Sequence, residues 1–185
     1  MMQYRFRCAS PLGGITLASD GTALTGLWFD GQRHHGDFSG TAVTEQALPV
    51  FAQTVRWLGI YFSGTDPGFT PPVRLLTTPF RRAVCEILQT VPYGQTVTYG
   101  EIAAILAAQR GISRMSAQAV GGAVGHNPVL LIIPCHRVIG ADGSLTGYAG
   151  GIERKRKLLE LEGSAADEKV LCLNKKSILE NERLR

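Results

Sequence analysis

The chain has 185 residues, of which 44% are hydrophobic and 18% are charged. This composition excludes a disordered protein, and the length suits one domain or two small ones. The longest uncharged apolar run, Val129 to Ile133, is far too short to span a bilayer. No secretory signal leads the sequence, so we expect a cytoplasmic protein that does not contact a membrane.

The cysteines are widely spaced, which argues against a disulfide framework and against a four-cysteine zinc site. Cys8, His34 and His35 are the only candidate metal ligands of these types near the N-terminus. Adjacent histidines fit one tetrahedral site poorly together with a distant cysteine, so we expect no metal.

The net charge of +4 is unevenly distributed. Residues 1–79 hold five arginines and five acids, whereas residues 80–163 hold nine lysines or arginines and six acids. The second stretch is therefore the better candidate for contact with a polyanion. A solvated surface with a chance surplus of charge is the alternative.

The first part of the chain predicts a small sheet followed by a helix. Alternating residues indicate strands at 4–8, 15–19 and 23–29, with a hairpin turn at Asp20-Gly21. Residues 30–43 are expected to form a loop. Residues 44–62 carry apolar side chains at helical spacing, at Leu48, Phe51, Val55, Leu58 and Phe62. Three prolines and two glycines between positions 64 and 72 favour a boundary there.

The second part predicts helices. Thr78-Pro79 is typical of a helix start, and Thr98 with Glu101 has the spacing of a capping box for a helix to about position 108. Ser113 or Ser116 begins a third helix that ends near Val124. Two helices joined by a short turn indicate a helix-turn-helix.

Three further features follow along the chain. Gly121-Gly122 lies inside the third helix, where glycine is unfavourable, which suggests close approach of another element or of a nucleic-acid strand. Residues 129–133 predict a buried extended segment. A last helix is expected over residues 153–162, ended by Gly163.

Cys135 is the strongest candidate for chemistry. It follows a proline at the end of the apolar run and precedes His136 and Arg137. Cationic neighbours lower a thiol pKa, and the thiolate is the nucleophile. Because adjacent residues of an extended segment face opposite ways, His136 reaches the sulfur only across a turn or through a water molecule. A carboxylate that orients the imidazole would complete the set, with Glu153, Glu160 and Glu162 as candidates.

Tyr99 and Tyr148 are further candidates. Tyr99 lies in the first turn of a predicted helix, and Tyr148 lies among glycines that leave backbone N–H groups open to a ligand. A phenol can donate a hydrogen bond to a substrate heteroatom. The alternative for each is a half-buried aromatic ring with a satisfied hydroxyl group.

These motifs together resemble the O6-alkylguanine-DNA alkyltransferases, also called methylated-DNA–protein-cysteine methyltransferases. Pro134-Cys135-His136-Arg137-Val138 resembles the active-site motif of that family. The segments 93–103, 119–123, 127–128, 147–148 and 158–159 fall in the order and spacing of the family. The resemblance is specific over residues 78–163 and weaker before them.

The resemblance implies an α/β fold with a small N-terminal antiparallel sheet and a helix in residues 1–77. A mostly helical domain with the helix-turn-helix would occupy residues 78–163, and the tail 164–185 matches nothing. The family binds duplex DNA through the minor groove and rotates the damaged guanine into a pocket. It transfers the alkyl group from O6-alkylguanine irreversibly to its own cysteine, once per molecule and without a cofactor. We expect a monomer, and we leave O4-alkylthymine open as a second substrate.

The resemblance also implies residue roles. Cys135 would accept the alkyl group, His136 would act as its base through water, and Glu162 would hold the imidazole. Tyr99 would hydrogen-bond the guanine and help to neutralise the leaving anion. The remaining substrate contacts would come from Asn127, which braces the active-site turn, from Arg137 in the motif, and from Val138, Tyr148 and Ala149. Cys8, Cys85 and Cys172 would not be acceptors.

One position departs from the family pattern. Many members carry an arginine two residues before the Val-Gly-Gly stretch, where it fills the gap left by the flipped base, and this chain has Gln118 there. We expect Gln118 to intercalate, although Arg110 or Arg114 could substitute from the loop. The predicted DNA contacts are then Arg114, Gln118, Ala119, Gly121 and Gly122.

Two other functions are alternatives to alkyl transfer. A module that binds the lesion without repairing it would lack the cysteine, which is present here. An unrelated Cys-His hydrolase would need a water path to an acyl-enzyme, and the motifs around Cys135 argue against it.

Overall fold

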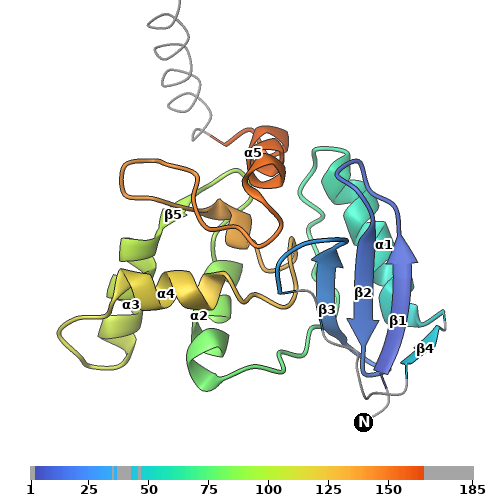
Figure 1. The fold of residues 1–185 in the computed structure, drawn as a ribbon, viewed down its shortest axis with the longest axis horizontal. Coiled ribbons are helices and arrows are strands. Elements are labelled where there is room, and N and C mark those ends of the chain that lie inside the picture. The colour runs from blue at the N-terminus through green and yellow to red at the C-terminus, as the bar shows by residue number, and fades with distance from the viewer. Residues whose placement is uncertain (1–2, 35, 37–42, 46, 165–185) are drawn as a thin grey trace, which may run out of the picture.

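The computed structural model describes residues 3–34, 36, 43–45 and 47–164. Its first half contains a four-stranded sheet in the order β3-β2-β1-β4 (Figure 1). Strands β1 (Gln3–Cys8), β2 (Ile15–Ser19) and β3 (Leu24–Phe29) form the predicted antiparallel meander. A short strand that was not predicted, β4 (Val43–Glu45), pairs with β1 in parallel. Of the predicted loop at 30–43, residues 30–34 and 36 contain no helix or strand, and residue 43 already belongs to β4. The other seven residues of that loop lie outside the described ranges.

Helix α1 (Pro49–Phe62) begins later than the sequence pattern predicts. Residues 44 and 45 belong to β4, so the predicted start at residue 44 is wrong. Proline has no N–H group and restricts the residue before it to extended backbone, which makes Pro49 a natural first residue of the helix. The buried face also differs from the predicted one, because Val55 is 39% exposed. The buried residues of α1 are Val50, Phe51, Thr54, Trp57, Leu58 and Tyr61.

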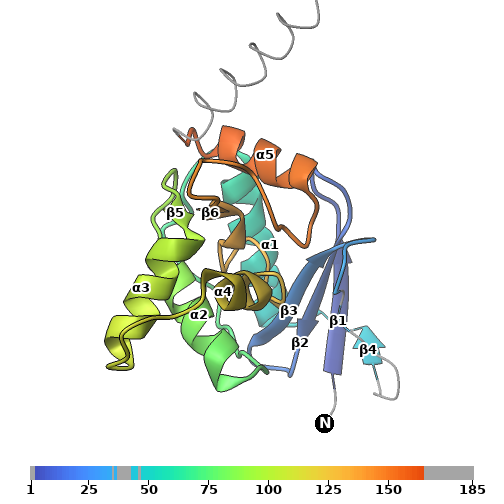
Figure 2. The same ribbon diagram turned by 60° about the vertical axis from the view of Figure 1, so that its left-hand side comes forward.

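Three helices follow the linker, and their predicted caps are confirmed. Thr78 accepts a hydrogen bond from the Arg81 N–H at the start of α2 (Pro79–Gln89). Thr98 and Glu101 form the full capping box of α3 (Tyr99–Gln109). Of the two predicted serines, Ser116 caps α4 (Ala117–Val124). Helices α3 and α4 lie side by side, with α2 against both (Figures 1 and 2).

The motif of Cys135 lies between these helices and helix α5 (Ile152–Leu161). Residues Cys135–Arg137 form one 3-10 turn, and strand β6 (Val138–Ile139) follows and pairs in parallel with β5 (Val97–Thr98). Gly163 has a φ of 63° and follows α5 closely, as predicted for the end of that helix.

The apolar run before Cys135 is buried but not extended. It forms successive turns, in which the Ile133 N–H donates to the Val129 carbonyl and Leu131 has a φ of 68°. Only Val129 pairs with a strand, at Leu27 of β3. The predicted extended segment is therefore wrong, because apolar composition identifies burial and leaves the backbone conformation open.

Buried side chains of both halves form one hydrophobic cluster, which includes Phe29 of β3, Tyr61 of α1, Leu88 of α2 and Leu158 of α5. The division into residues 1–77 and 78–163 therefore stays a prediction. Over the described ranges, no helix is both long enough and apolar enough to cross a membrane.

Candidate active site

Cys135 lies at the first position of the 3-10 turn and is 1% exposed. Burial raises the pKa of its thiol to about 11, against the opposing influence of an Asn127 hydrogen bond and the Lys155 charge. The resting side chain is therefore a thiol, and a base must remove its proton before it can act as a nucleophile.

Asn127 connects Cys135 to the turn that carries it. Its side-chain nitrogen lies 2.8 Å from the Ile133 carbonyl and 3.0 Å from the Cys135 sulfur, and its side-chain oxygen accepts from the Val129 N–H at 3.0 Å. All three contacts are buried, so they fix the position of the sulfur relative to the turn.

His136 is fully buried and faces Glu162. Its Nε2 lies 2.7 Å from Oε1 of Glu162, so the proton belongs on Nε2 and Nδ1 is left as an acceptor. Burial lowers the pKa of His136, which keeps the imidazole neutral. Nδ1 is buried without a partner among the described residues. This open acceptor is the feature expected of a base that receives a proton through water.

Glu162 is the carboxylate that orients His136, so the structure selects it from the three glutamates of this stretch. Glu153 and Glu160 instead pair with Arg156 at the surface. Burial by itself raises the pKa of Glu162, but the hydrogen bonds from His136 and Arg137 and the positive charge of Arg137 hold the pKa at about 2. The group is therefore ionised at neutral pH.

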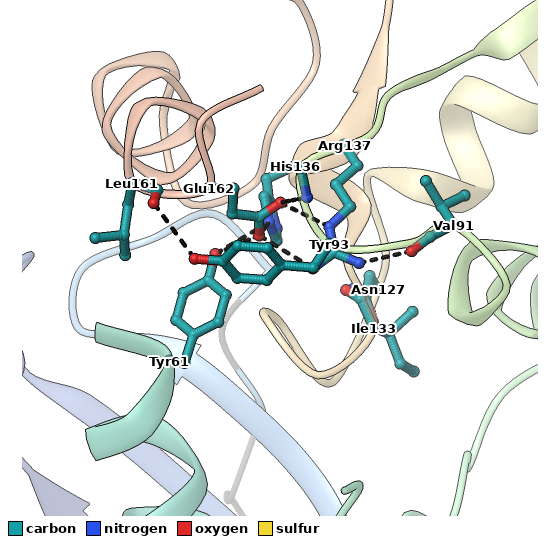
Figure 3. Close-up of polar contacts among 10 residues, drawn as sticks. Tyr61, Val91, Tyr93, Asn127, Ile133, His136, Arg137, Leu161 and Glu162 are labelled. Carbon is teal, nitrogen blue, oxygen red and sulfur yellow. Dashed lines mark hydrogen bonds and ion pairs between the residues drawn. The ribbon is translucent and has the colours of Figure 1, made fainter. Parts of the chain in front are cut away.

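Arg137 (Figure 3) and Gly94 also donate hydrogen bonds to Glu162. The guanidinium donates to both carboxylate oxygens, at 2.9 Å and 3.1 Å, and to the Val91 carbonyl at 2.6 Å. The Gly94 N–H donates at 3.2 Å, and a Cβ at this position would lie 2.9 Å from the Glu162 carbonyl oxygen. Arg137 is thus engaged inside the protein, and its predicted contact with the substrate stays a prediction.

Tyr61 of helix α1 also belongs to this network, and the sequence reasoning missed it. Its hydroxyl donates to Oε1 of Glu162 at 2.6 Å and lies 3.2 Å from Nε2 of His136 (Figure 3). Burial raises its pKa well above the ordinary value. The signal that could have found it is a second helical stripe, Val50, Thr54, Trp57 and Tyr61, which matches the period as well as the predicted face does.

Tyr99 and Tyr148 approach the site from two other segments. The half-buried Tyr99 donates to the Thr146 carbonyl at 3.0 Å, and burial raises its pKa. The ring of Tyr148 meets His136 edge-on, with 6.3 Å between the ring centroids. The Tyr148 hydroxyl is buried without a partner among the described residues. Ala149, whose N–H was predicted to face the substrate, is half-buried beside it.

Lys155 is a second residue that the sequence reasoning missed. It is fully buried on α5, where its ammonium donates to the Thr146 carbonyl at 2.7 Å and to the Val138 carbonyl. Burial lowers its pKa to about 8. The Val138 carbonyl retains a second lone pair for a ligand, and the predicted contact of Val138 with the substrate stays a prediction. Lys155 stands among Arg154, Arg156 and Lys157, and because lysines are normally exposed, nothing in the sequence marked it as buried.

The predicted DNA contacts lie on or just before α4. Arg114, Gln118, Ala119 and Gly122 are exposed, and Gly121 is half-buried. A Cβ at Gly121 would lie 3.7 Å from the Tyr99 ring, and one at Gly122 would meet nothing within 4 Å. Among the described residues, no neighbouring element therefore accounts for Gly122.

The other cysteines differ from Cys135. Burial raises the pKa of Cys85 to about 12, and Cys8 is half-buried with a raised pKa. Cys172 and His35 lie outside the described residues. Within those residues, no three potential ligands of the His, Cys, Asp or Glu type gather in one place.

Comparison with known families gives two matches. The DNA-binding domain of 6-O-methylguanine DNA methyltransferase matches residues 79–164. The ribonuclease-like domain of the same protein matches residues 3–75. Together these matches cover most of the chain.

Individual relatives agree with this result. A methylated-DNA–protein-cysteine methyltransferase of Mycobacterium bovis is 45% identical over 90% of this chain and 95% of its own length. An inducible methylated-DNA–protein-cysteine methyltransferase of Bacillus subtilis is 49% identical over 89% of this chain and 88% of its own. The crystal structure of Mycobacterium tuberculosis OGT in complex with DNA superposes with a TM-score of 0.76, at 43% identity, over 89% of this chain and 96% of that one. The chain therefore belongs to the methylated-DNA–protein-cysteine methyltransferase family.

Proposed function

We propose that this protein repairs DNA by transferring the alkyl group of O6-alkylguanine directly and irreversibly to its own Cys135. One observation carries the proposal: a buried thiol follows a proline turn, and the next residue presents an open imidazole acceptor backed by an ionised Glu162. Family membership supplies the reaction class, and this geometry supports Cys135 as the alkyl acceptor.

The proton moves first. The Cys135 thiol gives its proton through a water molecule to Nδ1 of His136, and the imidazolium that forms donates to Glu162 through Nε2. Tyr61, Arg137 and Gly94 hold Glu162 ionised and fixed during this step. Their role is to position the base, since none of them contacts the sulfur.

The alkyl group moves second. The thiolate attacks the alkyl carbon, a C–S bond forms, and the C–O6 bond breaks with its electron pair passing to the guanine. The guanine takes up one proton, which balances the proton lost by the thiol. Tyr99 would exchange its Thr146 acceptor for the guanine and stabilise the developing anion. The thioether is a poor leaving group, so each molecule reacts once.

Recognition requires the base to leave the duplex. Because Cys135 is 1% exposed, a stacked guanine cannot reach it, and the damaged nucleotide must rotate into the site. The small exposed residues of α4 suit insertion into the minor groove, with Gln118 filling the vacated position. The pairing energy is lowest at a damaged base, which favours the lesion over normal sequence.

The same proposal includes a monomer in the cytoplasm. The acceptor must stay reduced, and thiols stay reduced in the cytosol. The described cysteines, Cys8, Cys85 and Cys135, are all free.

The test is incubation with a duplex that carries one O6-methylguanine, followed by intact-mass measurement and peptide mapping. We expect one added methyl group on Cys135, saturating at one per protein, and none in Cys135→Ser. Cys8→Ser is the control and should react like the unsubstituted protein. Tight lesion binding without added mass would indicate a damage-binding module instead, and label on another cysteine would overturn the acceptor assignment.

A further inference from the structure

The segment from Thr146 to Gly150 carries two predicted substrate contacts but contains no helix or strand. Side-chain donors hold its two ends. Tyr99 and Lys155 donate to the Thr146 carbonyl at 3.0 Å and 2.7 Å. Arg154 donates through Nη1 to the Gly150 carbonyl at 2.9 Å. We refer to residues 146–150 as the substrate loop.

Arg154 also reaches the first half of the chain. Its Nε donates to the Leu12 carbonyl at 2.9 Å, in the loop that joins β1 and β2. The guanidinium carbon lies 4.7 Å from the centroid of the Phe29 ring, which adds a cation–π contact. Figure 2 shows α5 across the top of the molecule, with one end beside that loop.

The β1–β2 loop has a shape that admits this side chain. Gly13 has a φ of 113°, a conformation that other residues rarely adopt. A Cβ at Gly13 would lie 3.3 Å from Nη2 of Arg154, closer than ordinary contact. The guanidinium therefore occupies a space that the glycine leaves.

The outer side of the substrate loop is not filled by core side chains. A hollow of about 500 Å³ lies there, lined by residues 147–152, by Arg154 and by Gly31, Gln32 and Arg33. A loop beside a hollow has room to shift, so its position depends on the hydrogen bonds at its ends.

We propose that Arg154 is a positioning residue for alkyl transfer, which ties the β1–β2 loop to the Gly150 carbonyl and so holds Tyr148 and Ala149 against Cys135. This inference rests on the proposed function of Cys135. It gives the N-terminal half a part in the reaction, although that half contributes no reacting atom. The planar guanidinium of Arg154 donates to the Leu12 and Gly150 carbonyls and contacts the Phe29 ring at the same time. A lysine ammonium cannot reproduce that geometry.

The experiment compares Arg154→Ala and Arg154→Lys with Arg156→Ala. Arg156 lies one half-turn further along α5 and carries the same charge, and its ion pairs within the described ranges are with the surface residues Glu153 and Glu160. For each variant we would measure the rate of methyl transfer at saturating lesion duplex, the affinity for that duplex, its pH profile and the urea midpoint.

We expect the saturating rate of Arg154→Ala to fall about ten- to a hundredfold, because small misplacements of a reacting group have effects of this size. The pH profile should keep its shape, since the base is untouched. Affinity should change equally in Arg154→Ala and Arg156→Ala, which lose the same charge. Arg154→Lys should be slow despite its retained charge, and Arg156→Ala should react at the normal rate.

A saturating rate within about twofold of normal in both Arg154 variants would overturn the inference, as would an equal fall in Arg156→Ala. A lower urea midpoint with a normal rate would show a merely structural role and would also overturn it. If Arg154→Ala does not fold, the comparison rests on Arg154→Lys. Failure of the unsubstituted protein to gain a methyl group would instead refute the proposed function.

Discussion

The interior around Glu162 and the outer face of α4 are built in opposite ways. Around Glu162, charged and polar groups are buried and joined by short hydrogen bonds to Tyr61, His136 and Arg137. The exposed face of α4 offers alanine, glycine and one glutamine, with little side-chain bulk.

The difference separates two tasks. A base that works once must be held in its reactive tautomer before the substrate arrives, which requires fixed hydrogen-bond partners in the protein interior. A surface that enters a narrow DNA groove must instead carry small side chains. Perturbation of the interior should therefore affect stability and rate together, whereas perturbation of α4 should affect binding.

Replacement of the central carboxylate should have the largest effect. Glu162→Gln leaves the buried Arg137 guanidinium without its counter-charge, which we expect to cost about 3–5 kcal/mol of unfolding free energy. The measurement is urea denaturation, with Glu160→Gln, two residues earlier in the last turn of α5, as control. Because Glu160 is exposed and pairs with Arg156, its loss should cost no more than about 1 kcal/mol. Equal losses in both variants would contradict the buried network.

The second prediction concerns pH. The pKa of Glu162 in the folded state, about 2, is below its ordinary value of 4.5, so the ionised carboxylate stabilises the fold above pH 4.5. That contribution, about 3 kcal/mol, should be lost as the pH falls from 4.5 towards 2. His136 acts in the same direction at higher pH, since burial lowers its pKa from 6.5 and protonation favours the unfolded chain.

Urea midpoints measured from pH 7 to pH 3 would test this prediction. Glu162→Gln should show a shallower loss below pH 4.5, and the difference between the two curves isolates this residue from other carboxylates. Parallel curves would mean that Glu162 titrates normally.

A smaller effect is expected from Tyr61→Phe, which removes one donor and leaves the ring. Hydrogen bonds to charged groups contribute about 1.5–3 kcal/mol, so unfolding free energy should fall within that range. Tyr93→Phe is the matched control, because the Tyr93 hydroxyl donates to the neutral Leu161 carbonyl at 3.3 Å and should matter by about 0.5–1.5 kcal/mol. The methyl-transfer rate should also fall in Tyr61→Phe only. A larger loss of unfolding free energy in Tyr93→Phe than in Tyr61→Phe would contradict the proposed role of Tyr61.

The smallest change in stability is expected on α4. Gln118→Arg should raise the affinity for duplex DNA. The slope of log affinity against log salt concentration should become steeper by about one unit, because one more phosphate is neutralised. Gln118→Ala should lower the repair rate and leave the salt slope unchanged. Neither should change the free energy of unfolding by more than about 0.5 kcal/mol, because Gln118 is exposed. If both variants retain normal affinity and rate, Gln118 does not intercalate.

Local sequence signals predicted much of the fold. Thr78, Thr98 and Ser116 begin helices because their side chains bond the first free N–H groups, which is a property of a few adjacent residues. The apolar spacing continues through Pro49 and therefore predicts a start of helix α1 at residue 44, which is too early. The backbone preference of Pro49 determines the observed start.

The candidate site was predictable where its residues lie in one motif, and not where they come from distant segments. Cys135, His136 and Glu162 were named from the motif and the resemblance. Tyr61 reaches the site from a helix of the first half, and its position depends on how that helix packs, which no local pattern encodes. The burial of Lys155 was not predictable for a related reason, because a lysine among basic residues is normally exposed to solvent.

The pairing of Leu27 with the segment before Cys135 has a consequence for unfolding. The Leu27 N–H donates to the Pro128 carbonyl, and the Leu130 N–H donates back to Leu27. In the same way, the Leu24 N–H donates to the Pro72 carbonyl and the Arg74 N–H donates to the Leu24 carbonyl. The outer edge of β3 is therefore covered by residues 72–74 and 128–130. An exposed edge would pair readily with another molecule. The two halves should therefore melt in one transition, and the amide protons of Leu27 and Leu130 should exchange with solvent only when the whole protein opens.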